Sequence, residues 1–344
     1  MSGVALIGCG RVAPCHADAF GQLEGVPLLW ACDVVESRAR ELAARYGFHK
    51  MCQDYRNVLV DPEVSMVSLA LPHHLHGPVA LDAVRSGKHV LVEKPFTIQV
   101  QEGWGVVQQG RAAGVVVAPI VQHRFDPALR LIRELCQAEA LGRLHLARAH
   151  LECFRTRDYY ADSPWRGRWT TEGGSVLINQ AYHVADLLLW LAGPVEQLSA
   201  DMATLANPDV METEDVLCAT LRFSSGALGS LTVNGASGSM WDSYLELCGS
   251  QGAISFDLAY PNRVHRFRLQ SRRTQKQYQE QFDELARNSP PPPPALAYYG
   301  ISHREQARDF VAQTAGQPTR GATAEEALAT VDLIQRIYDA CKPG

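Results

Sequence analysis

The most chemically capable side chains of this chain stand at two places. Residues 87–95 read GKHVLVEKP, an apolar strand that stops at Glu93-Lys94-Pro95, and residues 179–183 read NQAYH, with an amide four positions before an imidazole. Histidine titrates near neutrality and suits acid–base catalysis, whereas a lysine can stabilise a developing negative charge or carry a proton if its pKa is lowered. We therefore predict that Lys94 and His183 handle a substrate proton, and the sequence leaves open which of them takes it first. Each alone has an ordinary explanation, a solvated lysine or a hydrogen-bonded histidine, so their combination carries the prediction.

A glycine-rich turn near the N-terminus predicts a dinucleotide site. Residues 4–13 read VALIGCGRVA, so Gly8-x-Gly10-x-x-Ala13 follows an apolar strand and opens a helix. The first glycine makes the tight turn, the second lets the backbone approach a pyrophosphate, and the small third residue allows close helix packing. The start of the helix offers N–H groups to the anion. We assign to the cofactor the residues of this turn, which are Gly8, Cys9, Gly10, Arg11 and Val12.

Asp33 ends the next predicted strand, roughly twenty residues past the glycines, where a carboxylate binds the adenosine ribose hydroxyls and repels a 2′-phosphate. NAD is therefore the predicted cofactor rather than NADP. Arg38 is a further cofactor candidate because it could serve a phosphate, but its position in a helix after Glu36 favours a solvated side chain.

Residues 71–76, which read LPHHLH, follow a strand predicted at 65–70, at the edge where such sheets bind ligands. Three histidines so close suggest zinc, but no carboxylate or cysteine stands at zinc-like spacing and His76 is placed to begin a helix, so we predict no metal. We place the residues of these strand ends beside the nicotinamide or its ribose: Leu71, Pro72, His73, His76, Glu93, Lys94 and Gln122. Arg124, two residues past Gln122, is a substrate candidate, with a structural salt bridge as the alternative.

The elements that must position these residues differ between the two halves of the chain. Apolar strands are predicted at 3–8, 27–32, 65–70, 88–92 and 115–119, alternating with helices at 11–22, 36–46, 76–86 and 99–113. This alternation predicts a parallel, doubly wound sheet. We expect an NAD-binding domain over 1–120.

A second α/β domain is expected over 121–344. Longer strands are predicted at 143–154, 195–205, 213–222, 226–235, 243–249, 252–258 and 262–270, with helices at 126–137, 175–191, 300–315 and 323–340. Because several strands are consecutive, the sheet should be largely antiparallel. Residues 271–294 are charged, glutamine-rich and end in five prolines, so we predict an exposed, flexible loop there.

The composition narrows the class of protein. The 344 residues are 46% hydrophobic and carry a net charge of −5, which gives no basic stripe for nucleic acid. Nine cysteines stand singly, which favours reduced thiols. No signal peptide and no apolar stretch of transmembrane length are evident. We expect a cytoplasmic protein with a small-molecule substrate and neither a nucleic-acid nor a membrane partner.

Four motifs occur in a fixed order along the chain: Gly-x-Gly-x-x-Ala, Leu-Pro-x-x-Leu-His, the Glu93-Lys94-Pro95 segment and the glycine-rich segment leading to His183. In this order they resemble the glucose–fructose oxidoreductase / inositol dehydrogenase / rhizopine catabolism (Gfo/Idh/MocA) family, and the resemblance covers nearly the whole chain. The resemblance implies a Rossmann domain and a second α/β domain with an open sheet that often mediates homo-oligomer contacts, as a dimer or tetramer. It also implies NAD-dependent oxidation or reduction of a sugar or cyclitol carbinol, with Lys94 matching the catalytic lysine. The segment Trp165-Arg166 resembles one near the cofactor or a neighbouring subunit; a packed aromatic with a structural cation is the alternative.

One departure narrows the substrate. The family's Asp-x-x-x-His is Asn179-x-x-x-His183 here, and on a helix these positions share a face. Similar Asn-Gln-x-x-His segments occur in relatives that look like 3-dehydrogenases of nucleotide-linked amino sugars. We predict an NAD-dependent sugar dehydrogenase that oxidises a ring CH–OH, at C3, of an amino sugar, aminoglycoside or nucleotide-linked sugar. An inositol or free-sugar dehydrogenase and a non-catalytic dinucleotide sensor are the alternatives. The substrate residues would be Lys94, Arg124, Tyr160, Asn179, His183 and Tyr299.

Overall fold

The computed structural model describes residues 3–238, 241–290 and 302–342, and the chain divides into two compact units. Unit 1 comprises Met1–Gln122 and Pro293–Val331, and unit 2 comprises His123–Pro292 and Asp332–Gly344. The first break is close to the expected boundary at 120. Residues 293–331 depart from the expected division, because they return to unit 1.

Unit 1 is built on a six-stranded parallel sheet in the order β3-β2-β1-β4-β5-β6. Its strands are β1 (Gly3–Ile7), β2 (Leu28–Cys32), β3 (Lys50–Cys52), β4 (Val64–Leu69), β5 (His89–Val92) and β6 (Val117–Pro119). All five residues of β1 are buried, as expected of a strand covered on both faces. This order reverses direction between β1 and β4, and ligands bind at such a switch point in doubly wound sheets.

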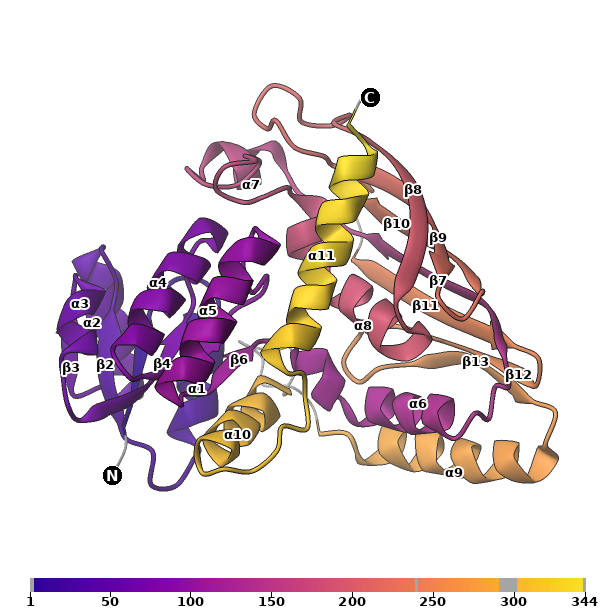
Figure 1. The fold of residues 1–344 in the computed structure, drawn as a ribbon, viewed down its shortest axis with the longest axis horizontal. Helices are drawn as coiled ribbons and strands as arrows, with labels where there is room; N and C mark the ends of the chain where they lie inside the picture. The colour runs from indigo at the N-terminus through magenta and orange to yellow at the C-terminus, as the bar shows by residue number, and fades with distance from the viewer. Residues whose placement is uncertain (1–2, 239–240, 291–301, 343–344) are drawn as a thin grey trace. The chain divides into compact units, whose positions relative to one another are not determined.

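The helices of unit 1 are α1 (Ala13–Gly21), α2 (Glu36–Tyr46), α3 (Tyr55–Leu59), α4 (His73–Arg85), α5 (Val100–Ala113) and α10 (Ser302–Thr314). Helices α4 and α5 lie side by side against β4, β5 and β6 (Figure 1), while α1 packs with α2 and α10. The edge-on rings of Phe20 and Phe310, 6.3 Å apart, join α1 to α10 in the core. The strands and helices predicted for residues 1–120 are confirmed. The structure adds β3 and α3, which the sequence did not indicate.

Unit 2 is built on a seven-stranded sheet in the order β13-β12-β11-β7-β10-β9-β8. Its strands are β7 (Leu144–Glu152), β8 (Val195–Ala203), β9 (Val216–Phe223), β10 (Leu228–Asn234), β11 (Asp242–Gly249), β12 (Gly252–Phe256) and β13 (Val264–Leu269). Only β7 and β10 pair in parallel; the other pairs are antiparallel. The alternating burial along β9 shows that one face of the sheet is covered. The mostly antiparallel sheet is therefore confirmed.

The remaining helices are η1 (Gln122–Phe125), α6 (Pro127–Gln137), α7 (Arg157–Ala161), α8 (Tyr182–Ala192), α9 (Arg272–Asn288) and α11 (Ala324–Ala340), with a π-helical turn η2 (Val176–Gln180) before α8. The single helix predicted over 175–191 is therefore two elements. Helix α8 packs against β7 and β11. Residues of α11 up to Val331 belong to unit 1, and the later ones belong to unit 2.

The prediction of a flexible loop over 271–294 is wrong for residues 272–288, which form α9. Ser271 caps this helix by accepting a hydrogen bond from the Thr274 N–H. Phe282 is buried and packs edge-on against Phe267 of β13, with ring centroids 5.5 Å apart. Most other residues of this helix are polar, so composition alone was misleading. Residues 291–294 lie outside the described residues.

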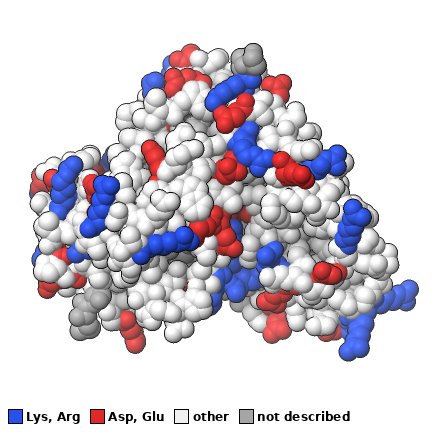
Figure 2. Space-filling view, viewed as in Figure 1, with Lys and Arg blue, Asp and Glu red and all other residues white. Residues whose placement is uncertain are grey.

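Charged side chains of both signs lie on the face shown in Figure 2, where Lys and Arg are interspersed with Asp and Glu. No helix within the described residues is both long and apolar enough to cross a membrane.

Candidate active site

The glycine turn between β1 and α1 has the geometry that a dinucleotide needs. Gly8 has φ +95°, and a Cβ there would lie 2.2 Å from the Ala70 carbonyl oxygen, so no other residue fits. A Cβ on Gly10 would meet no described atom within 4 Å, so the space beside the turn is open. Val12 stands at the N-cap of α1 and has no capping side-chain hydrogen bond. The open turn and the helix N-terminus fit a pyrophosphate.

Asp33 lies at the end of β2 and is fixed by two backbone groups. Its Oδ2 accepts a hydrogen bond from the Cys9 N–H at 2.8 Å, and its Oδ1 accepts one from the Val35 N–H at 2.8 Å. Each oxygen keeps a lone pair for a further donor, which suits ribose hydroxyls. Burial, followed by the charge of Asp33, raises the pKa of Cys9 to about 12, so this thiol is not a nucleophile. Arg38 is exposed on α2, in line with the expectation of a solvated side chain.

His76 joins the ends of β4 and β5. Its Nδ1 lies 2.6 Å from the Pro95 carbonyl oxygen and its Nε2 lies 2.9 Å from the Leu71 carbonyl oxygen. Burial lowers the pKa of His76, and a neutral imidazole has one N–H, so it donates to one of these carbonyls at a time. Helix α4 begins at His73 rather than at His76, which corrects the expected start. Both histidines are buried, so the Leu-Pro-His segment is a packed corner of the sheet edge.

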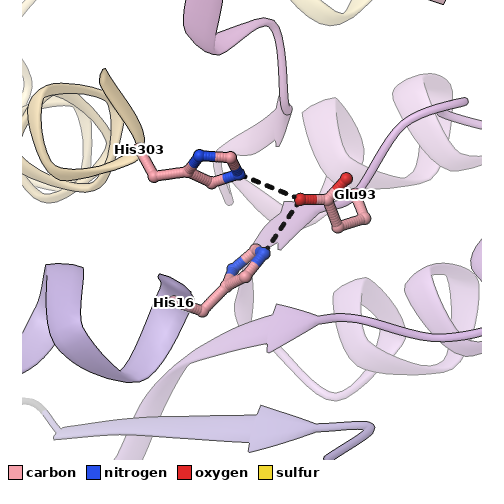
Figure 3. Close-up of side chains that lie close together, drawn as sticks. All are labelled: His16, Glu93 and His303. Atoms are coloured by element: carbon pink, nitrogen blue, oxygen red, sulfur yellow. Dashed lines mark hydrogen bonds and ion pairs between the residues drawn. The ribbon is translucent and has the colours of Figure 1, made fainter. Parts of the chain in front are cut away.

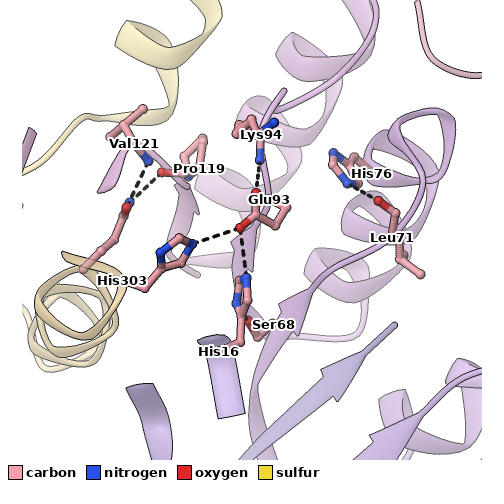
Figure 4. A network of polar contacts seen from close by, with 10 residues as sticks. His16, Ser68, Leu71, His76, Glu93, Lys94, Pro119, Val121 and His303 are labelled. Atoms are coloured by element: carbon pink, nitrogen blue, oxygen red, sulfur yellow. Dashed lines mark hydrogen bonds and ion pairs between the residues drawn. The ribbon is translucent and has the colours of Figure 1, made fainter. Parts of the chain in front are cut away.

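Lys94 follows β5 and is half-buried, and its backbone N–H donates to Oε2 of Glu93 at 3.0 Å. The other oxygen of Glu93, Oε1, lies 3.0 Å from Nε2 of His16 and 3.2 Å from Nε2 of His303 (Figure 4). The sequence did not single out either histidine. His16 stands on the helix that the glycine turn opens, whereas His303 comes from α10, more than two hundred residues later.

Gln122 is buried at the end of unit 1, and its Oε1 has no hydrogen-bond partner among the described residues. A buried acceptor without a donor is costly, so a ligand that donates a hydrogen bond fits here. The glycine turn, Asp33 and Gln122 thus fit a nicotinamide dinucleotide, and these residues would hold it.

In unit 2, Asn179 is part of a buried network around two glutamates. Its Nδ2 donates to Oε1 of Glu172 at 2.6 Å, and the Gly167 N–H donates to Oε2 of Glu172 at 2.6 Å. Oε1 of Glu214 accepts the Leu177 N–H at 2.9 Å and the Tyr338 hydroxyl at 2.8 Å. Burial raises the pKa of each glutamate to about 7. The π-helical turn that carries Asn179 is therefore anchored to two buried carboxyl groups.

His183 stands on the first turn of α8 and is half-buried. Its ring packs edge-on against His123, with ring centroids 4.9 Å apart. Nδ1 of His123 lies 2.7 Å from Oδ2 of Asp126, a contact that the sequence did not suggest. Asn179 belongs to η2 and His183 to α8. The i, i+4 spacing of one continuous α-helix, from which the sequence analysis inferred a shared face, therefore does not describe these two residues.

Four other substrate or cofactor candidates, Arg124, Tyr160, Trp165 and Arg166, make packing or ion-pair contacts in unit 2. Arg124 forms a buried ion pair with Asp186, with Nη2 2.8 Å from Oδ1, which is the structural alternative given above. Tyr160 is buried and its hydroxyl lies 3.1 Å from the Ser175 hydroxyl, so it offers no open stacking face. The Arg166 guanidinium lies over the rings of Tyr159 and Trp165, at 4.4 Å and 4.8 Å from their centroids. Tyr299 lies outside the described residues.

Two family models match this chain. Residues 2–120 match the model of an oxidoreductase family with an NAD-binding Rossmann fold, and residues 129–255 match the GFO/IDH/MocA C-terminal domain. Together the two models match well over half of the chain.

Individual relatives are distant but extensive. The chain is 26% identical over 257 residues to myo-inositol 2-dehydrogenase of Thermotoga maritima, covering 74% of this chain and 75% of that protein. It is 27% identical over 288 residues to levoglucosan dehydrogenase of Pseudarthrobacter phenanthrenivorans, covering 74% and 73%. The crystal structure of the WlbA dehydrogenase from Bordetella pertussis, in complex with NADH and UDP-GlcNAcA, superposes with a TM-score of 0.89 at 26% identity, covering 99% of this chain and 95% of that one. The chain therefore belongs to the GFO/IDH/MocA family and is an NAD-dependent oxidoreductase with an N-terminal Rossmann domain.

Proposed function

We propose that this protein oxidises a ring secondary alcohol, at C3, of an amino sugar, an aminoglycoside or a nucleotide-linked sugar to a ketone. The observation that carries the proposal is Asn179, an amide at the position where the family pattern has aspartate, held by the buried carboxyl group of Glu172. The likeness to the WlbA dehydrogenase, solved with UDP-GlcNAcA, supports a nucleotide-linked amino-sugar substrate.

The proposed reaction breaks two bonds of the carbinol. The O–H proton goes to His183 as general base, and the C–H bond breaks with its electron pair, leaving a carbonyl group. NAD supplies the hydride acceptor when bound. Lys94 would stabilise the developing negative charge on the oxygen as the proton leaves.

Glu172 does not suit the binding of a substrate ammonium group. Its side chain is fully buried and both oxygens accept hydrogen bonds from within unit 2. Its contribution to the proposed site is to orient the amide of Asn179, and the amide is the group that would meet a substrate hydroxyl or N-acetyl group.

Two other functions compete. The likeness to myo-inositol 2-dehydrogenase favours oxidation of a cyclitol or a free sugar. A non-catalytic dinucleotide sensor would keep the fold and bind NAD without turnover, and the presence of both Lys94 and His183 argues against it. The resemblance also implies a homo-oligomer, which light scattering of the purified protein would test.

Steady-state turnover separates these functions. The purified protein would be assayed with NAD on UDP-linked amino sugars and uronates, aminoglycoside intermediates, free sugars and inositols, with reduced nicotinamide followed by absorbance. We expect turnover on the first two groups. Exclusive activity on inositols would replace the proposal by the cyclitol alternative, and NAD binding without turnover of any alcohol would favour the sensor. An absorbance spectrum of the protein as purified would reveal a retained reduced cofactor.

A further inference from the structure

A buried carboxylate in unit 1 is held by side chains from two helices. Figure 3 shows His16 of α1 and His303 of α10 pointing at the same oxygen of Glu93, at Nε2–Oε1 distances of 3.0 and 3.2 Å. All three side chains are buried. Burial alone would raise the pKa of Glu93, but the hydrogen bonds from His16 and His303 hold this pKa well below its usual range. The carboxyl group is therefore ionised and acts only as an acceptor.

The donors can be assigned from this charge. Because Oε1 of Glu93 only accepts, each histidine presents an Nε2–H to it. Nδ1 of His16 lies 2.8 Å from the hydroxyl oxygen of Ser68 on β4, so a further hydrogen bond joins His16 to that strand. The second oxygen of Glu93 accepts the backbone N–H of Lys94. A continuous chain of hydrogen bonds thus runs from β4 and two helices to the lysine backbone.

Helix α10 also forms hydrogen bonds with the end of β6, the strand next to β5. Gln306, three residues after His303 and on the same face of the helix, accepts the Val121 N–H at 2.9 Å and donates to the Pro119 carbonyl at 2.8 Å. Both partners lie at the end of β6 (Figure 4). A helix from the C-terminal part of the chain therefore fixes the carboxyl ends of both β5 and β6, next to Lys94 and Gln122.

We propose that His16 and His303 are positioning residues, which hold the Glu93 carboxylate so that it fixes the Lys94 backbone at the end of β5. The proposal rests on the role of Lys94 in the proposed function. His303 makes α10 part of the catalytic apparatus although it touches no reacting atom. A 1 Å displacement of a catalytic group can reduce turnover roughly hundredfold, so such support matters.

The same three side chains could chelate a metal, since their ligand atoms lie within 4.8 Å of one another. The two Nε2–Oε1 distances are those of ordinary N–H···O hydrogen bonds. Oε1 of Glu93 thus has a donor on each side, because both Nε2 atoms lie within hydrogen-bond distance of it. The hydrogen-bonded arrangement accounts for the geometry without an ion.

Hydrogen exchange of the Lys94 amide tests the proposal without any substrate. The chain has only five lysines, Lys50, Lys88, Lys94, Lys276 and Lys342, so protein labelled with ¹⁵N-lysine gives few backbone signals. The variant Lys94→Arg assigns the signal of interest. Exchange would be measured in the full-length wild type and in His303→Leu, His303→Asn and His303→Gln. In the last variant the side-chain amide can replace the Nε2 donor, whereas asparagine is too short to reach Oε1.

We expect Lys94 exchange to be roughly tenfold faster in His303→Leu and His303→Asn, and within about twofold of wild type in His303→Gln, because a hydrogen bond to a charged group is lost only in the first two. His49→Gln, at an exposed histidine of unit 1, is the matched control and should change nothing. Unchanged Lys94 exchange in folded His303→Leu or His303→Asn would overturn the proposal. So would stoichiometric zinc in the purified wild type that His303→Gln removes.

Turnover of a substrate found in the panel above gives the second measurement. We expect kcat to fall roughly tenfold or more in His303→Asn with little change in KM for NAD, and to recover in His303→Gln. Equal kcat in all three variants would count against positioning. If the wild type turns over no alcohol while Lys94 exchange still responds to His303, the proposed function fails and the hydrogen-bonded support of Lys94 stands.

Discussion

Asn179 donates a hydrogen bond from its amide nitrogen to a fully buried carboxyl oxygen of Glu172 at 2.6 Å. The aspartate that the family pattern leads one to expect at position 179 would place a second carboxylate against Glu172. Two carboxyl groups at such a distance cannot both ionise without a large rise in the pKa of one of them. A neutral amide, which donates a hydrogen bond and carries no charge, is therefore compatible with this buried carboxyl group.

Asn179→Asp should destabilise the protein, and more so at alkaline pH. We expect a loss of about 1–3 kcal/mol in the free energy of unfolding near pH 8, because a donor is replaced by an acceptor that is charged at that pH. The loss should be smaller near about pH 5.5, where the two carboxyl groups can share a proton. Denaturant unfolding at both pH values measures the difference.

The double variant Glu172→Gln with Asn179→Asp should recover most of the loss. The new glutamine oxygen can accept the Gly167 N–H while its nitrogen donates to the introduced carboxylate, so the original hydrogen bonds are restored with the partners exchanged. Asn57→Asp, at an exposed asparagine of unit 1, is the control. A double variant no more stable than Asn179→Asp would show that the pair does not act as described.

The buried glutamates also predict a pH dependence of stability. The pKa of Glu214 is raised from 4.5 to about 7, first by burial, so the folded chain binds this proton more tightly than the unfolded chain. Stability from such a group is fully present below about pH 4.5 and is lost as pH rises through about 7. Glu172 has the same raised pKa and acts in the same direction.

We therefore expect the free energy of unfolding to fall between about pH 5 and pH 8, by an amount on the order of 3 kcal/mol for each glutamate. In Glu214→Gln the fall should be shallower, because that variant has no proton to lose at this position. It should be less stable than wild type near pH 5, since Glu214 accepts the Tyr338 hydroxyl and two backbone N–H groups, and the gap should narrow near pH 8. Parallel pH curves for the two proteins would contradict this account.

Local sequence was sufficient to predict most strands and helices of the Rossmann half, but not β3, α3 or the return of residues 293–331 to unit 1. Its strands are runs of buried apolar residues such as Val4–Ile7, and Gly8 and Asp33 stand at fixed places after them, so one segment at a time carried the information. The NAD cofactor and the family followed from the same short motifs and are confirmed. The helix α9 was missed because its docking depends on Phe282 meeting Phe267, which no local composition reveals.

The rest of the candidate site depends on contacts between distant segments. His303 meets Glu93 across 210 positions, and Tyr338 meets Glu214 across 124. Arg124 shows the opposite limit, because its position after the last strand of the Rossmann half made it a substrate candidate, while its actual partner, Asp186, lies 62 residues away. A single sequence indicates which side chains can do chemistry, but only tertiary packing decides which of them are already engaged.

Removing either proposed proton-transfer group should lower turnover strongly, and removing His183 should leave cofactor binding in place. We expect His183→Asn and Lys94→Ala each to lower kcat by roughly a hundredfold or more, the usual size of an acid–base contribution. NAD binding, measured by calorimetry, should change little in His183→Asn, because His183 belongs to unit 2 and the residues that fit the dinucleotide belong to unit 1. Lys276→Ala, at an exposed lysine of α9, is the control. Intact turnover in both active-site variants would show that the mechanism is wrong.

Cofactor choice should depend on Asp33. Its carboxylate accepts the Cys9 and Val35 N–H groups and lies where a 2′-phosphate would bring negative charge, so NADP is disfavoured by repulsion as well as by the lost ribose hydrogen bond. Asp33→Asn removes the charge and keeps one carbonyl acceptor. We expect kcat/KM for NADP relative to NAD to rise roughly tenfold or more, which corresponds to about 1.4 kcal/mol of discrimination.

The salt dependence of the preference for NAD over NADP distinguishes two effects of Asp33→Asn, loss of charge repulsion and loss of the hydrogen bonds that hold the glycine turn. Repulsion between Asp33 and a 2′-phosphate is partly screened by ions, so the wild-type preference for NAD should weaken as ionic strength rises, while that of Asp33→Asn should change little. Glu41→Gln, at an exposed acid on α2, removes an equal charge away from the turn and should leave the preference as it is. If Asp33→Asn instead loses NAD affinity without gaining NADP turnover, Asp33 serves mainly to hold the Cys9 backbone, and its charge does not select the cofactor.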